Sequence, residues 1–282
     1  MKVLSEEQIA RWRRDGFLSP FPLLDAVELQ TCRDGLQRFE QWLGGPVNGT
    51  AEMKWRTMPY LILPWAAKLA QDPRILDTIE DLLGPDLLIY TSTFFIKEPH
   101  SPTIAAWHQD STYFGLEPKE AVTVWIALNE ANEAAGCMEA LSFRGRPRQL
   151  RHASRVVANS VNRASQMIVE PLDNGRPVAM PLVAGTFSMH HGLCPHRSGP
   201  NTADHRRIGL GLIYIPTHVR QVGSIRPAAM LVRGADRFGH FDWVGPAKAE
   251  LDPEDLAIHD KAVALYRDCY LEEEARHAHL SA

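Results

Sequence analysis

The chain changes character at Leu87-Leu88-Ile89-Tyr90-Thr91-Ser92-Thr93-Phe94-Phe95-Ile96-Lys97, a run of β-branched and aromatic residues that ends shortly before Pro99. Such side chains fit the pleated surface of a sheet, so the run predicts a long strand. Further strand-like runs follow at 121–128, 137–141, 167–171, 186–190 and 208–215. Short strands separated by turn signals are typical of a sandwich or a partly closed barrel, and we expect a mainly β core over residues 86–216.

Helical patterns flank this core. Capping residues and periodic apolar positions predict helices over 5–16, 25–43 and 73–83, so residues 1–85 should be mainly helical. From about residue 217 the sequence reads as loop and then as a charged helix near 253–277. The length would allow two small domains, but no repeat, low-complexity segment or linker divides the chain, which favours a single domain over residues 1–282.

Composition excludes several classes of protein. The chain has 282 residues, of which 45% are hydrophobic and 23% charged, and its net charge of −4 gives no reason to expect a nucleic-acid partner. No stretch approaches the roughly 18 apolar residues that span a bilayer, and the start lacks a signal-peptide pattern. Its four cysteines lie far apart, with no zinc or disulfide spacing. We therefore expect a cytoplasmic protein with free thiols and no membrane association.

Three residues have the types and order of a metal site. His108 and Asp110 are two apart, which on an extended strand places both side chains on one face, and His196 lies further along the chain. Two imidazoles and one carboxylate can occupy one face of an octahedral Fe(II), leaving three positions for a co-substrate and O₂. His190 and His191 could compete with His196, although a structural or pocket-lining position is favoured for His191.

An arginine strengthens this interpretation. Arg207 follows His196 and opens the apolar strand expected at 208–215. If 2-oxoglutarate chelates the iron, its distal carboxylate needs a bidentate cation, which guanidinium supplies better than ammonium. Arg206 is the adjacent competitor. Neighbours on a strand face opposite sides, so only one of the two can reach the pocket.

The same residues carry a family resemblance. Trp107-His108-Gln109-Asp110-Ser111-Thr112-Tyr113-Phe114, the Gly136-Cys137-Met138 turn, and His196-x-Ser198-Gly199-Pro200-Asn201 with Arg207 resemble the phytanoyl-CoA dioxygenase family of Fe(II)/2-oxoglutarate oxygenases. The resemblance implies a double-stranded β-helix, a jelly-roll or cupin-like core. It also implies that His108, Asp110 and His196 bind iron, that Arg207 holds the distal carboxylate of 2-oxoglutarate, and that Trp125 and Ser198 help to seat it.

One segment departs from the family pattern. Ser142-Phe143-Arg144-Gly145-Arg146 replaces a Pro-Gly-Ser-His run, in a loop expected to border the pocket. Basic residues continue from there to Arg151. They could attract an anionic substrate, but a solvated loop is favoured.

The substrate pocket is less well defined by the sequence. Tyr113 and Phe114 follow the ligand pair and could form a pocket wall, or could be ordinary core aromatics. Gln109, between the ligands, and Lys97, at the end of a strand, are further candidates, although a lysine there more often reaches the surface. An irregular segment could supply a lid or simply pack on the helices; it contains Trp55, Arg56 and Trp65. We expect surface positions for His100, His152, His205, His218 and His240.

These residues predict an Fe(II)- and 2-oxoglutarate-dependent oxygenase that acts on a C–H bond of a small molecule with release of succinate and CO₂. Halogenating relatives replace the ligand carboxylate by a small residue so that chloride can bind, and Asp110 fills that place. Hydroxylation, or a desaturation or cyclisation begun by the same hydrogen abstraction, is therefore favoured over chlorination. A zinc enzyme is one alternative, since the same residues can bind Zn²⁺. A binding protein that has lost catalysis is another. The substrate and the oligomeric state are left open.

Overall fold

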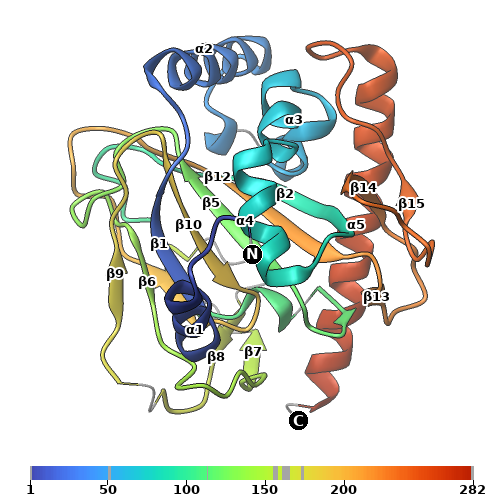
Figure 1. Cartoon of the computed structure of the whole chain (residues 1–282). Helices are drawn as coiled ribbons and strands as arrows, with labels where there is room; N and C mark the ends of the chain where they lie inside the picture. The colour runs from blue at the N-terminus through green and yellow to red at the C-terminus, as the bar shows by residue number, and fades with distance from the viewer. Residues whose placement is uncertain are drawn as a thin grey trace.

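The computed structural model describes residues 2–49, 52–112, 114–154, 158–160, 166–172 and 175–280. Two sheets form its core, and helices cover the outside (Figure 1). The larger sheet has the order β1-β10-β5-β12-β2-β14-β15. Its strands are β1 (Phe17–Pro22), β2 (Leu87–Lys97), β5 (Val122–Ala127), β10 (Thr186–His191), β12 (Arg207–Pro216), β14 (Ala228–Arg233) and β15 (Asp242–Trp243).

The smaller sheet has the order β3-β11-β6-β9. Its strands are β3 (Ala105–His108), β6 (Met138–Ala140), β9 (Val178–Met180) and β11 (His196–Ser198). Two minor sheets pair β4 (Leu116–Glu117) with β13 (Arg220–Gln221), and β7 (His152–Ser154) with β8 (Gln166–Ile168). From β2 to β12 the chain passes repeatedly from one main sheet to the other. This alternation is that of a double-stranded β-helix and confirms the expected fold class.

Strand β12 shows how the larger sheet separates the hydrophobic core from a cavity. All ten of its residues are buried. On one face, Leu210 joins the main hydrophobic cluster and Tyr214 donates a hydrogen bond to the carbonyl of Ala70 at 3.0 Å. On the other face, Arg207 and Ile213 line a cavity between the sheets. The period of two along the strand thus divides structural from pocket-facing positions.

The predicted helices are confirmed. They are α1 (Glu6–Asp15), α2 (Ala26–Leu43), α4 (Pro73–Leu83) and α5 (Pro253–Leu280). Ser5 and Asp25 each form a capping box at the start of a helix, and Gly16 and Gly44 end α1 and α2 with positive φ angles. A further helix, α3 (Pro64–Ala70), and four short 3₁₀ turns were not predicted. The turns are η1 (Val47–Gly49), η2 (Met53–Arg56), η3 (Pro59–Leu61) and η4 (Asp110–Thr112).

The larger sheet includes strands outside residues 86–216, the range expected to form the core. Strand β1 precedes residue 86 and pairs antiparallel with β10, while β14 and β15 follow residue 217. Two prolines obscure β1 in the sequence, because proline cannot donate to a strand ladder. They are tolerated here since β1 is an edge strand.

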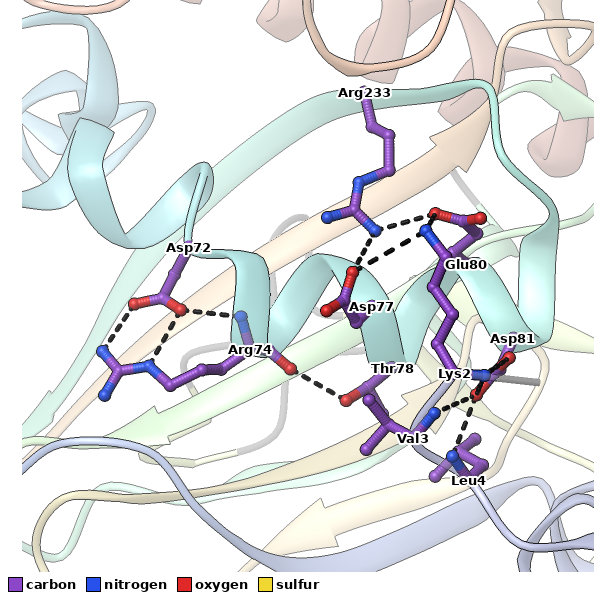
Figure 2. Close-up of polar contacts among 10 residues, drawn as sticks. All are labelled: Lys2, Val3, Leu4, Asp72, Arg74, Asp77, Thr78, Glu80, Asp81 and Arg233. Carbon is purple, nitrogen blue, oxygen red and sulfur yellow. Dashed lines mark hydrogen bonds and ion pairs between the residues drawn. The ribbon is translucent and has the colours of Figure 1, made fainter.

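Helix α4 contacts both the N-terminal segment and strand β14 (Figure 2). The carboxylate of Asp81 accepts hydrogen bonds from the backbone amides of Lys2, Val3 and Leu4, at 2.7 to 2.9 Å. One turn earlier, Asp77 accepts a hydrogen bond of 2.6 Å from Arg233, at the end of β14. The N-terminal segment and an outer strand of the larger sheet are therefore tied to the same helix.

Two further expectations concern the chain as a whole. All four cysteines are buried and free. None of the helices in the described part of the chain has both the length and the apolar character needed to cross a bilayer.

Candidate metal centre

His108 and His196 face each other across two paired strands. They are register partners in the antiparallel pairing of β3 with β11, and their ring centroids lie 4.1 Å apart. The Nδ1 of His108 lies 2.8 Å from the carbonyl of Ala106, and the Nδ1 of His196 lies 2.9 Å from that of Cys194. A carbonyl only accepts hydrogen bonds, so each Nδ1 carries the proton. Each Nε2 is then left with a lone pair that can bind a metal.

The carboxylate of Asp110 completes the group. Asp110 begins the 3₁₀ turn η4, and its Oδ1 lies 3.5 Å from Nε2 of His108 and 3.6 Å from Nε2 of His196. One ligand atom from each residue lies within 4.8 Å of the others, so a single ion could touch all three. We call His108, Asp110 and His196 the triad. The structure thus brings together the three residues that the sequence singled out.

The protonation states of the triad suit a divalent cation. Burial alone would raise the pKa of Asp110, but the surrounding imidazoles of His196, His108 and His190 hold it well below its usual range. Burial, followed by the neighbouring His108 and His190, lowers the pKa of His196 well below its ordinary value. An ionised carboxylate beside an unprotonated imidazole is the state that metal binding requires.

Gln109 does not line the cavity, contrary to the prediction. Its side chain is fully buried and donates to the carbonyl of Arg148 at 2.9 Å, while its backbone amide donates to Nε2 of His152 at 3.0 Å. His152 was expected on the surface but is only 3% exposed. Between the two ligands of an extended pair the middle residue points away, and here it anchors the turn to the loop behind it.

His190 and His191 point to opposite sides of β10. His190 lines the cavity, with Nε2 3.1 Å from Oδ2 of Asp110. The ring of His191 lies against Phe143, and its Nδ1 accepts a hydrogen bond from the amide of Leu193 at 3.0 Å. Burial lowers the pKa of His191 to about 4. His191 is therefore a neutral packing residue, as favoured, whereas His190 contacts the triad.

Arg207 reaches the same cavity from β12. It is 5% exposed, and its guanidinium donates to the carbonyl of Gly136 and lies 5.4 Å from the ring centroid of Trp125. Its Nε has no hydrogen-bond partner among the described residues, and no carboxylate there pairs with it. Burial lowers the pKa of Arg207 to about 10. A buried cation without a counter-ion is costly, so this end of the cavity fits an anionic ligand.

Arg206 faces the other way, as expected for a neighbour on a strand. It pairs with Glu40 at 2.7 Å and with Glu98 at 2.9 Å. Its charge is therefore compensated by protein carboxylates, and Arg207 is the residue of the two that lines the cavity.

Lys97 is buried rather than exposed. Its side chain is 2% exposed, donates to Oγ of Ser198 at 2.8 Å and also contacts the carbonyl of Gly199. Ser198 lines the cavity, whereas Lys97 is not among the lining residues. Both readings of Lys97 were therefore wrong. It lies behind the cavity wall, where its amine positions the Ser198 hydroxyl.

The cavity lining also includes aromatic residues outside the triad. Phe114 lines the cavity as predicted, and Tyr113 lies outside the described residues. Two tyrosines one turn apart on α5, Tyr266 and Tyr270, also line it and were not predicted. Their i, i+4 spacing is the signal that could have revealed them. They come from the far end of the chain, so no local pattern linked them to the triad.

The three residues of the proposed lid segment have different surroundings in the structure. Arg56 lines the cavity, whereas Trp55 stacks on His259 at 5.8 Å and Trp65 packs on Phe94 at 5.9 Å. The two tryptophans are packing residues. The stacking on His259, in α5, holds the backbone that carries Arg56.

The loop 142–146, whose sequence differs from the family pattern, packs on the end of α1 and does not border the cavity. Oγ of Ser142 donates to Oδ1 of Asp15 at 2.8 Å, and the ring of Phe143 lies against His191. Further along, Arg148 pairs with Glu170 at 2.6 Å on the surface. The basic run is therefore a solvated loop, as favoured. None of its described residues lines the cavity.

Comparisons with known proteins place the chain in a family. The family model described as phytanoyl-CoA dioxygenase matches residues 12–209. Phytanoyl-CoA dioxygenase domain-containing protein 1 of Bos taurus is 31% identical over 122 residues, which cover 43% of this chain and 42% of that protein. A probable alpha-ketoglutarate-dependent hypophosphite dioxygenase of Stutzerimonas stutzeri is 26% identical over 152 residues, covering 53% of this chain and 52% of that protein.

The chain thus spans about half the length of these curated relatives. Among solved structures, the apo form of the non-heme monooxygenase ThoJ matches with a TM-score of 0.83 at 28% identity, covering 95% of this chain and 98% of that one. The similarity in fold therefore extends over nearly the whole chain, well beyond the segment that the family model matches.

Proposed function

The chain belongs to the phytanoyl-CoA dioxygenase family, and on that basis we propose that it is an Fe(II)- and 2-oxoglutarate-dependent dioxygenase acting on a small molecule. One observation carries the proposal. The triad and Arg207, a buried cation for which no carboxylate partner lies among the described residues, line the same cavity. A metal protein without an anionic co-substrate would have no use for such a cation in the cavity that contains its ligands.

The triad fits Fe(II) by its donor chemistry. His108 and His196 would each supply Nε2 and Asp110 would supply Oδ1, a set of two imidazoles and one carboxylate. This combination is typical of non-haem iron oxygenases and leaves positions open for other ligands. When bound, Fe(II) with 2-oxoglutarate supplies the activation of O₂ for C–H oxidation, with decarboxylation of the co-substrate to succinate and CO₂.

Three residues would hold 2-oxoglutarate at the other end of the cavity. Arg207 would pair with the distal carboxylate through two guanidinium N–H groups, a geometry that favours arginine over lysine. The ring of Trp125 would flank the carbon chain, and the Ser198 hydroxyl, fixed by Lys97, would offer a further hydrogen bond. These residues orient the co-substrate and exclude water from it.

We propose hydroxylation as the outcome of C–H oxidation. The carboxylate of Asp110 occupies the place that a halide would need on the metal, which argues against halogenation. The cavity has a volume of about 140 Å³, enough for on the order of ten water-sized groups, which suits small ligands. The rest of its lining would offer the substrate the aromatic side chains of Phe114, Tyr266 and Tyr270 together with polar groups such as Arg56.

The test is an anaerobic visible spectrum of the protein with Fe(II), before and after 2-oxoglutarate is added. We expect the charge-transfer band of a chelated keto acid in the parent chain and its loss in Asp110→Ala. The Thr91→Val variant, whose side chain lines the cavity without contacting the triad, should keep the band. Metal binding without a band would overturn the proposal. Activity restored by Zn(II) rather than Fe(II) would favour a zinc enzyme instead.

A further inference from the structure

The two carboxylate oxygens of Asp110 have different surroundings. Oδ1 faces the Nε2 atoms of His108 and His196, at 3.5 and 3.6 Å. Oδ2 instead accepts a hydrogen bond from Oγ1 of Thr123 at 2.8 Å and lies 3.1 Å from Nε2 of His190. One oxygen is thus turned toward the other two ligands, and the other is engaged by two residues outside the triad.

Both of these residues lie on the face of the larger sheet that lines the cavity. Thr123 lies on β5 and His190 on β10, and the two are register partners in the antiparallel pairing of these strands. Asp110 follows β3 of the smaller sheet. The carboxylate is therefore held from the opposite sheet by two neighbouring side chains on paired strands, which is a rigid support.

The hydrogen-bond chemistry fixes the role of His190. An ionised carboxylate only accepts hydrogen bonds, so Nε2 of His190 must carry the proton that it directs at Oδ2. A ring nitrogen that donates in this way has no lone pair left for a metal. The other ring nitrogen, Nδ1, is buried and has no hydrogen-bond partner among the described residues. His190 is therefore placed to hold a ligand rather than to become one.

We propose that His190 and Thr123 are positioning residues that keep Asp110 a one-oxygen ligand, an inference that rests on the iron site proposed above. Two donors use both lone-pair directions of Oδ2, so this oxygen cannot also bind the metal. The triad then fills three of six positions. If both oxygens bound, only two positions would remain, and a chelating keto acid would leave none for O₂.

Co(II) titration of the metal-free protein tests this, because the visible bands of Co(II) report both affinity and a change in the ligands around the ion. We expect His190→Leu to weaken Co(II) binding by about 10-fold to 100-fold, the usual effect of losing a partner of a metal ligand. Its visible bands should also shift, because a second carboxylate oxygen would replace one of the other ligands. His190→Gln, which keeps an N–H donor, should restore most of the affinity and the parent spectrum.

A second variant guards against a folding defect in His190→Leu. Thr123→Val is nearly isosteric and removes the other donor, and it should also weaken Co(II) binding. Thr91→Val, the same change on the same sheet face, should not, because no contact joins Thr91 to Asp110 in the described structure. Since both donors act on one oxygen, the effects of His190→Leu and Thr123→Val should not add.

The outcomes separate the two proposals. If His190→Leu and Thr123→Val bind Co(II) with the parent affinity and spectrum, the positioning role is wrong and the iron site stands. If the parent binds neither Co(II) nor Fe(II), the iron site is wrong and the positioning role falls with it. Thermal unfolding of each metal-free variant shows whether it is folded at the temperature of the titration, and only the affinities of folded variants are compared.

Discussion

Lys97 and Arg207 lie directly opposite each other as register partners on β2 and β12. Both are buried, yet only Arg207 lines the cavity. Burial, helped by the nearby guanidinium of Arg207 and opposed by Cys137, lowers the pKa of Lys97 to about 6. At neutral pH the amine is therefore uncharged, and the positive charge at this end of the cavity belongs to Arg207.

The first prediction is a pH dependence of stability that comes from Lys97. Unfolded lysine titrates near 10.5, so between about pH 6 and 10.5 the unfolded chain binds one proton more than the folded chain does. Lys97 therefore adds to the free energy of unfolding of the parent as the pH rises over this window, by at most about 1.4 kcal/mol per pH unit. Lys97→Met removes this contribution.

Urea unfolding of the metal-free proteins at several pH values measures the difference. Lys97→Met should gain stability relative to the parent as the pH falls from about 9 to about 6. The lost hydrogen bond to Ser198 is a constant offset and does not change this slope. Parallel curves for the two proteins would show that Lys97 keeps an ordinary pKa.

The second prediction concerns the two neighbouring arginines. Arg207→Ala should weaken 2-oxoglutarate binding about 100-fold, because it removes charge-assisted hydrogen bonds worth roughly 3 kcal/mol together. Fe(II) affinity should be unchanged, since Arg207 is not in the triad. Arg206→Ala is the matched control: it loses its pairs with Glu40 and Glu98 and should bind 2-oxoglutarate as the parent does. Titration of the charge-transfer band measures both, and equal affinities would contradict the assignment.

The third prediction concerns the glycine beneath Trp125. A Cβ built on Gly209 would lie 1.9 Å from the ring of Trp125, so a methyl group there must displace the indole. Gly209→Ala should cost about 1–3 kcal/mol of stability through overpacking and weaken 2-oxoglutarate binding as the ring moves. Gly45→Ala meets nothing within 4 Å and should leave both quantities unchanged. A Gly209→Ala protein with parent affinity would remove Trp125 from the co-substrate site.

The fourth prediction concerns the contacts drawn in Figure 2. Asp81→Ala should cost about 1 kcal/mol and speed hydrogen exchange at residues 3 and 4, because their amides lose the carboxylate that accepts from them. Asp77→Ala, on the same helix, loses the contact with Arg233 and a longer ion pair with Nζ of Lys2 at 3.9 Å, while Lys2 keeps its ion pair with Glu80 at 2.7 Å. It should leave exchange at residues 3 and 4 as in the parent, because Asp81 still accepts from their amides. If both variants speed exchange equally, the N-terminal segment and β14 depend on α4 as one unit.

Local sequence patterns predicted many of the helices and strands and the residues of the triad. The strand Leu87–Lys97 and the helix Pro73–Leu83 have the bounds that their patterns gave, since both have clear ends. The triad residues lie together as expected, because a two-residue spacing and a register pairing place their side chains at one point. Contacts made by distant segments were missed. His152 and Lys97 are buried by loops and strands far from them in sequence, and β1 is hidden by its prolines.

The position of Tyr266 and Tyr270 has a consequence for how this cavity can vary. Both lie on α5, beyond the residues 12–209 that the family model matches, yet they face the cavity that contains the triad. The matched segment carries the candidate ligands and Arg207, while a terminal helix supplies two aromatic residues of the cavity lining. Mutation can therefore change that part of the lining without touching the candidate ligands, so the two parts of the chain can vary separately.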